Sequence, residues 1–425
     1  MTLSEISTAR VSERAASLSE DYRRVRAASE ALCAPLAVED YGIQTMPDVS
    51  PPKWHLAHVS WFFETFVLKP FARGYTEFHP QFAHLFNSYY ETVGTFHPRP
   101  ERGLLARPTV AEVFAYRRHV DAAMARLLAD PPAQHADAIR QRVQLGLNHE
   151  QQHQELLVTD IKHIFAYSPL RPVYHANVAP RRAAPKADWI AFPAGLHEIG
   201  HDGDGFGFDT EFPRHRVFLE AFLLASRPVS NAEYLAFVEG GGYRRAELWL
   251  SAGWAQIRNA KWDHPLYWER TAGDWEHMTL AGWTPLDPDA PVCHLSYFEA
   301  DAYARWCGKR LPTEMEWEVA ATRLPVQGNF ATNGWLQPAA TAHTGLTQMF
   351  GDVWEWTSSA YAAYPGYRPL GGALGEYNGK FMCGQFVLRG GSCATPAGHI
   401  RASYRNFFYP HDRWQFSGLR LADDL

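Results

Sequence analysis

The pattern of hydrophobic positions divides the chain into a helical first part and a loop-rich second part. In the first part, apolar residues recur every three or four positions in four stretches, as on one face of an α-helix. These stretches are roughly 13–32, 53–68, 110–128 and 136–166. The third stretch begins at Thr109 and Glu112, a capping-box pattern, and ends before two prolines that follow Asp130. Four such helices with longer connections predict a helix bundle, whose interior is a common place for metal sites.

The second part of the chain has a different texture. Residues 168–187 are rich in proline and basic side chains and have no periodicity, which marks a domain boundary. Beyond them the segments are short and strand-like, with many glycines and tryptophans. The brief helices that we predict there are Asn231–Glu239, Tyr297–Trp306 and 313–321. We therefore predict a helical domain over 1–170, a linker over 171–187 and a mixed α+β domain over 188–425.

Composition narrows the class of protein. A chain of 425 residues, 46% of them hydrophobic, is long enough for two buried cores. Its formal net charge of −6, without long runs of one sign, argues against nucleic acid or an anionic membrane as the main partner. No stretch approaches the roughly 20 apolar residues of a membrane span, and the N-terminal residues lack the apolar core of a secretory signal. Because the five cysteines are scattered and odd in number, we expect reduced thiols and a cytoplasmic location.

Histidines in two of the predicted helices form a candidate metal site. His149 and His153 are four residues apart in the fourth helix and therefore share one face. Neutral imidazole suits zinc, iron, copper and nickel alike. His55 and His58, three residues apart, each offer a third ligand, and spacing alone does not decide between them. Two histidines four residues apart, with no further evidence for a metal site, are more often ordinary polar residues of a helix.

Glu150 gives this segment a second interpretation. His149, Glu150 and His153 match the H-E-x-x-H pattern of zinc peptidases, with the glutamate as general base. The extended peptidase pattern needs glycine and histidine where this chain has Leu156 and Thr159, and the other form needs a downstream carboxylate that spacing cannot identify. Three histidines without a carboxylate would leave room on an octahedral ion for O2 and two substrates, as oxygen-activating iron requires. Zinc in the same place would supply only Lewis-acid or bound-water chemistry.

Seven short motifs carry a resemblance that covers nearly the whole chain. Three of them resemble the EgtB family of ergothioneine-biosynthesis sulfoxide synthases, also called hercynine oxygenases. They are PPKWHLAHVSWFFE at 51–64, FNSYYE at 86–91 and GLNHEQQHQE at 146–155. The other four resemble the formylglycine-generating-enzyme (sulfatase-modifying-factor) fold. They are RLPTEMEWE at 310–318, GDVWEW at 351–356, LRGGS at 388–392 and GLR at 418–420. Together they imply a DinB-like four-helix bundle followed by a loop-rich formylglycine-generating-enzyme or C-type-lectin-like domain.

The resemblance implies a metal and a reaction. It assigns His58, His149 and His153 as the ligands of Fe(II). It implies that O2 oxidises a thiol together with hercynine, the Nα-trimethyl betaine of histidine, so that sulfur becomes joined to imidazole C2 as a sulfoxide. The thiol donor would be cysteine or γ-glutamylcysteine. One branch of the family has Trp-Asp where this chain has Phe407 and Phe408, and that Asp contacts γ-glutamylcysteine, so the donor stays open.

Further residues receive roles from the same resemblance. Tyr89 and Tyr90 fall in the motif that supplies a proton and an electron, and the chemistry of a phenol suits that role. Gln152 would bond the hercynine imidazole. The remaining implied contacts are those with the carboxylate of the thiol donor (Arg99 and Arg102) and those with the trimethylammonium betaine (Asn406, Phe407 and Phe408).

Four other functions stay open as alternatives. The first is a related selenoneine-type synthase that joins a selenosugar to hercynine on the same two-domain plan. The second is formylglycine-generating oxidase activity, which needs a pair of cysteines near the C-terminus that segment 404–409 lacks. The third is an H-E-x-x-H zinc hydrolase. The fourth is a binding module without catalytic activity.

Overall fold

The computed structural model describes residues 3–425, with side chains from residue 17 onward, and forms two compact units. The first unit consists of the chain up to Tyr167 together with a separate later segment, Gly372–Tyr377. The second unit consists of Ser168–Gly371 and Asn378–Leu425. The first unit is helical and the second contains strands, as predicted from the sequence. The contiguous domain ranges predicted above do not anticipate that Gly372–Tyr377 belongs with the helices.

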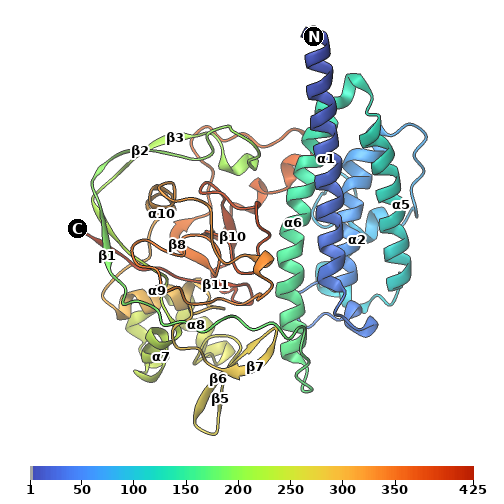
Figure 1. Cartoon of the computed structure of the whole chain (residues 1–425). Coiled ribbons are helices and arrows are strands. Elements are labelled where there is room, and N and C mark those ends of the chain that lie inside the picture. The colour runs from blue at the N-terminus through green and yellow to red at the C-terminus, as the bar shows by residue number, and fades with distance from the viewer. Residues whose placement is uncertain (1–2) are drawn as a thin grey trace. The chain divides into compact units, whose positions relative to one another are not determined.

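Four long helices lie side by side in the first unit (Figure 1). α1 packs on α6, and α2 packs on both α5 and α6. Their bounds are Leu3–Cys33 for α1, Pro52–Phe63 for α2, Val110–Ala129 for α5 and Ala136–Tyr167 for α6. Two short helices, α3 (Lys69–Phe71) and α4 (Phe82–Phe86), lie between α2 and α5 in the chain. Each long helix overlaps one of the four periodic stretches, so the prediction of a bundle is confirmed for this unit.

Local sequence explains where these helices begin and end. The Thr109 hydroxyl accepts the Glu112 backbone N–H at 3.2 Å, and the Glu112 carboxylate accepts the Thr109 N–H at 2.7 Å. This reciprocal capping box starts α5. α2 begins with proline at its first position, and all 12 of its residues are buried. Beyond Phe63 it continues as one wider π-helical turn over Glu64–Leu68, where the prediction had it continue as a regular helix.

The second unit contains small sheets joined by loops. Within the described residues there are four: β1-β4-β12, β10-β9-β8-β11, β2-β3 and β5-β6-β7. Among the strand pairs of these described sheets, β8–β11 is parallel and the others are antiparallel. The strands are β1 (Trp189–Phe192), β2 (Gly195–Ile199), β3 (His215–Leu219), β4 (Phe222–Ala225), β5 (Trp268–Thr271), β6 (Asp274–Thr279), β7 (Gly282–Pro285), β8 (Trp354–Ala360), β9 (Phe386–Arg389), β10 (Asn406–Phe408), β11 (Ser417–Gly418) and β12 (Ala422–Asp424).

The helices of the second unit are short and mostly begin at capping boxes. They are α7 (Asn231–Glu239), α8 (Ser251–Ala260), α9 (Tyr297–Trp306) and α10 (Glu314–Ala321). Three of the four begin at a serine or threonine whose side chain accepts a backbone N–H of the first turn, and these are the three that the sequence predicts. α8 was not predicted. Its N-cap is Leu250, which cannot cap, so the usual start signal is missing.

The sequence motifs of the second unit meet in buried ion pairs. Arg389 pairs with Glu318. Arg420 lies 2.8 Å from Glu355, which also accepts the indole N–H of Trp317 at 2.8 Å. All four charged side chains are at most 2% exposed. These charges are buried in pairs, as buried charges must be, and they join segments far apart in the chain. The motifs therefore hold the loop-rich fold together.

Two general observations concern the described residues as a whole. None of their helices is long and apolar enough to cross a membrane. All five cysteines are free thiols. A cytoplasmic location stays a prediction.

Candidate metal centre

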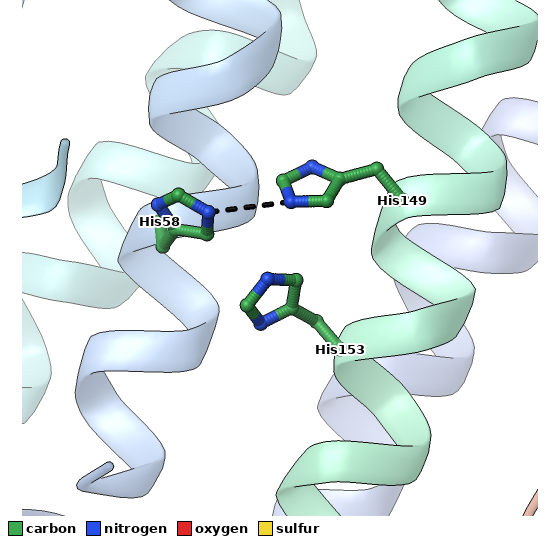
Figure 2. A group of neighbouring side chains, drawn as sticks. All are labelled: His58, His149 and His153. Carbon is green, nitrogen blue, oxygen red and sulfur yellow. Dashed lines mark hydrogen bonds between the residues drawn. The ribbon is translucent and has the colours of Figure 1, made fainter. Parts of the chain in front are cut away.

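Three histidines from two helices of the first unit converge in its interior. His58 comes from α2, whereas His149 and His153 come from successive turns of α6 and point toward it (Figure 2). Each offers one ring nitrogen, and these nitrogens all lie within 4.8 Å of one another. His58 and His149 are buried, and His153 is half-buried. His55, the alternative that spacing left open, lies outside this group.

The surroundings of His58 determine which of its nitrogens faces the other histidines. Its Nδ1 lies 2.5 Å from the backbone oxygen of Phe86, which can only accept, so Nδ1 is the donor. Its Nε2 therefore carries a lone pair, and it lies 3.3 Å from Nε2 of His149. The rings of Trp54 and Trp61 stack on that of His58, with centroids at 4.5 Å and 5.5 Å. These contacts orient Nε2 toward the centre of the group.

Burial keeps the three imidazoles neutral. It lowers the pKa of His149 to about 3. Burial and the neighbouring His149 hold the pKa of His58 well below its ordinary value, and burial with the other two rings does the same for His153. A neutral imidazole is the form that binds a metal. Three neutral nitrogen donors that share one small volume therefore fit a transition-metal ion such as iron or zinc.

Glu150 points away from the histidines into a buried cluster of charges. Its carboxylate lies 2.9 Å from the Arg26 guanidinium and 3.2 Å from that of Arg117, and it accepts the Ser29 hydroxyl at 2.6 Å. Burial alone would raise the pKa of Glu150, but the two arginines and these hydrogen bonds outweigh it and lower the pKa. A carboxylate that is paired in this way is a poor general base. The geometry therefore argues against the H-E-x-x-H hydrolase.

Two residues near the histidines come from different parts of the chain. The Tyr377 ring lies edge to face against that of His149, with centroids 5.2 Å apart, and its hydroxyl donates to the side-chain oxygen of Gln152. Gln152 was predicted as a site residue, but Tyr377 was not. Tyr377 follows a glycine-rich segment with no periodic pattern, so its sequence gave no signal of a functional position. Tyr377 is identified as a site residue by the structure, which places it in the helical unit and in contact with His149 and Gln152.

The predicted pair Tyr89 and Tyr90 stack on each other, with ring centroids 4.8 Å apart. Tyr89 lies 6.3 Å from Tyr377 by ring centroids, whereas Tyr90 packs against Trp61 and Phe66 in the core. Burial raises the pKa of both phenols, so they keep their protons at neutral pH. Tyr89 is thus one ring away from His149, through Tyr377, and Tyr90 is one ring away from His58, through Trp61.

The two predicted arginines have different environments. Arg102 is 4% exposed, and its guanidinium lies 3.4 Å from the ring centroid of Trp54, which stacks on His58. Within the described residues it forms no ion pair, and its partners are the hydroxyls of Ser50 and Ser88 at 2.9 Å and 3.1 Å. Burial and the charge of Arg99 hold the pKa of Arg102 well below its usual value. Arg99 itself is half exposed beside Asp48. Of the two arginines, Arg102 is therefore the better candidate to bind an anionic group of a substrate.

Asn406, Phe407 and Phe408 lie together on β10 of the second unit. The Asn406 side-chain oxygen accepts the Phe407 N–H at 2.9 Å. Phe407 stacks on Tyr361, with centroids 4.1 Å apart, and Phe408 lies edge to face with Trp414 at 5.7 Å. These three residues are near one another but belong to a different unit from the histidines.

The fold and the site together define a class: a helical bundle with a three-histidine candidate metal centre, joined to a strand-containing domain. Residues 21–157 match the DinB superfamily. Residues 175–344 and 331–425 match the sulfatase-modifying factor enzyme 1-like domain. Both halves of the resemblance drawn from the sequence motifs are thus confirmed.

Two of three curated relatives match along nearly the whole chain, and the third along about half of it. The hercynine oxygenase of Mycolicibacterium thermoresistibile is 32% identical, over 89% of this chain and 88% of the relative. That of Mycolicibacterium smegmatis is 31% identical, over 90% and 93%. That of Mycobacterium tuberculosis is 36% identical, over 51% and 56%. The chain belongs to the hercynine oxygenase family.

Proposed function

We propose that this chain is an Fe(II)- and O2-dependent sulfoxide synthase of ergothioneine biosynthesis. It joins the thiol of cysteine or γ-glutamylcysteine to C2 of the hercynine imidazole. The reaction consumes one O2. The thiol and the C2 carbon each lose a hydrogen, one oxygen atom becomes the sulfoxide oxygen, and the other leaves as water.

One observation carries the proposal: three neutral imidazoles, two of them buried and one half-buried, converge in a chain of the hercynine oxygenase family. An all-histidine site without a carboxylate leaves several metal positions for reactants. When bound there, Fe(II) would supply the one-electron chemistry that O2 requires. His58, His149 and His153 would hold it.

The residues around the histidines support roles in binding and proton supply. Gln152 accepts from Tyr377, so its amide N–H2 is oriented and could donate to an imidazole nitrogen of hercynine. Tyr89, which is half-buried, and Tyr90, which is buried, keep their phenol protons near the histidines, which suits proton donation during turnover. The phenol of Tyr377 is the third one in this group and the one in contact with a histidine ring.

Charged and aromatic side chains support recognition of two substrate groups, the carboxylate of the thiol donor and the trimethylammonium betaine of hercynine. Among the residues that the structure describes, buried Arg102 forms no ion pair and bonds only hydroxyl groups, so the carboxylate of the thiol donor would complete its environment. We assign Arg99 to the same substrate in a secondary role, because Asp48 already lies beside it. Asn406, Phe407 and Phe408 are assigned to the trimethylammonium betaine, which aromatic faces attract. Phe407 and Phe408 offer no carboxylate, so cysteine is at least as good a donor candidate as γ-glutamylcysteine.

Reconstitution tests the proposal directly. Protein loaded anaerobically with Fe(II) is given O2, hercynine and either thiol, and the products are analysed by mass spectrometry. We expect a product equal in mass to thiol plus hercynine, with one oxygen gained and two hydrogens lost. His153→Ala, at equal folding, should lose iron and product together. Iron-loaded protein that forms no sulfoxide with either thiol contradicts the proposal, and coupling only to a selenosugar would favour the selenoneine-type alternative.

A further inference from the structure

His55 lies beside the three-histidine group and has both of its ring nitrogens engaged. Its side chain is 4% exposed. Nδ1 lies 2.9 Å from Nδ1 of His153, and Nε2 lies 2.9 Å from Oδ2 of Asp160. The same oxygen of Asp160 accepts the backbone N–H of Ser50 at 2.8 Å. Asp160, His55 and His153 thus form a buried row that ends at a candidate metal ligand.

The carboxylate sets the direction of each hydrogen bond in this row. An ionised carboxylate only accepts, so Nε2 of His55 is a donor. A neutral imidazole carries one N–H, so Nδ1 of His55 is then an acceptor, and Nδ1 of His153 must donate to it. Nε2 of His153 therefore carries the lone pair, and this is the nitrogen that would bind a metal.

We propose that His55 and Asp160 are positioning residues that hold His153 as its Nδ1–H tautomer and fix the angle of its ring. The inference rests on the metal centre of the proposed function. It parallels His58, whose Nδ1 is held by the Phe86 carbonyl. Because His55 lies on α2 whereas Asp160 and His153 lie on α6, the row also links the two helices that carry the candidate ligands.

Three substitutions separate positioning from packing. His55→Phe keeps a ring of similar size and loses both hydrogen bonds. His55→Gln keeps one donor and one acceptor. Asp160→Asn keeps an oxygen that can accept from His55 but removes the charge. The matched control is His163→Gln, a half-buried histidine of α6 whose Nδ1 bonds the Thr45 hydroxyl at 2.6 Å.

Co(II) binding to the full-length apo-protein is the measurement, because it needs no turnover. The dissociation constant and the visible spectrum of bound Co(II) are recorded, with thermal unfolding of each apo-protein as the folding check. We expect His55→Phe to weaken binding by roughly 10- to 100-fold and to shift the spectrum, as loss of an outer-sphere partner does. His55→Gln should recover most of this loss, Asp160→Asn should lose less than His55→Phe, and His163→Gln should match the unsubstituted protein.

Several results would overturn the inference. One is His55→Phe with unchanged affinity and spectrum, and another is His55→Gln as weak as His55→Phe, which would indicate packing alone. If His55→Phe does not fold, the affinities of His55→Gln and Asp160→Asn decide, and wild-type values for both refute the inference. Unsubstituted protein that binds no Co(II) refutes the metal centre itself. Unsubstituted protein that binds metal but forms no sulfoxide refutes the proposed function while leaving the positioning role intact.

Discussion

Replacing Glu150 by glutamine should loosen the helical unit without removing a metal ligand. Its carboxylate joins three helices, because Arg26 comes from α1, Arg117 from α5 and Glu150 itself from α6. Glu150 and Arg117 are 0% exposed and Arg26 is 4% exposed, so the pairs are almost free of solvent screening. Glutamine keeps the size of the side chain but leaves two buried guanidinium groups with less negative charge.

The contacts that remain set the size of the effect. Removing one partner of a buried ion pair costs about 3–5 kcal/mol. Arg26 keeps Asp121 at 2.7 Å, and Arg117 keeps Glu30 at 3.2 Å. We therefore take the lower end of the range, about 3 kcal/mol, which corresponds to roughly a 150-fold increase in the opening equilibrium of this unit.

Hydrogen exchange of the α6 backbone amides is the suitable assay, because a chain with two compact units need not unfold in one step. Glu150→Gln should raise exchange in α6 by roughly 150-fold if the amides exchange through this opening. Glu155→Gln, the same substitution at a half-buried position of α6, should leave the exchange rate near that of the unsubstituted protein. Unchanged exchange in Glu150→Gln combined with lost activity would refute the reasoning and would restore Glu150 as a catalytic base.

Three further predictions follow from individual contacts. Arg102→Met should raise KM for the thiol donor by roughly 10- to 100-fold, since a hydrogen bond to a charged group is worth about 1.5–3 kcal/mol, and Arg99→Met should raise it less. Equal effects of the two on KM would contradict the assignment. Replacing both Tyr89 and Tyr90 by Phe should divert turnover from sulfoxide to oxidation of the thiol alone, and an unchanged product ratio would remove them from the mechanism. Burial raises the pKa of Asp352 to about 6, so its folded form takes up a proton before the unfolded chain does. As pH falls from about 6.5 to 4, the stability of the unsubstituted protein relative to Asp352→Asn should rise by about 2 kcal/mol, and a flat difference in chemical denaturation would contradict this.

Local rules account for the part of the site that could be predicted. His149 and His153 share a face because four residues make about one helical turn, whatever surrounds the helix. His58 and His55 could not be separated in this way, because α2 is buried on every side and both positions lie inside the protein. Which of them completes the group with His149 and His153, and which lies behind His153, depends on the rotation of α2 against α6. Packing decides that rotation, and only the family resemblance favoured His58 beforehand.

Long-range contacts account for what was missed. Tyr377 joins the helical unit from a segment more than 200 residues beyond α6, after a stretch whose glycines give no period. Its position depends on contacts such as those of Glu376, which accepts the backbone N–H groups of Glu91 and Thr92 at 3.0 Å and 3.1 Å. No window of neighbouring residues contains both sides of such a contact. α8 was missed for a local reason, the absence of a capping side chain.

The three candidate ligands differ in what orients them. Nδ1 of His58 is held by the Phe86 carbonyl, and Nδ1 of His153 by His55. Nδ1 of His149 is buried, and no protein atom among the described residues accepts from it. Its ring is held by packing, with Phe62 at 4.7 Å and Tyr377 at 5.2 Å by ring centroids. A hydrogen bond restricts the angle of a ring more tightly than packing against its faces does. A substitution or movement of Tyr377 should therefore change the ring angle of His149 more than that of His58 or His153. Through this contact the segment that sequence analysis missed affects the candidate metal centre.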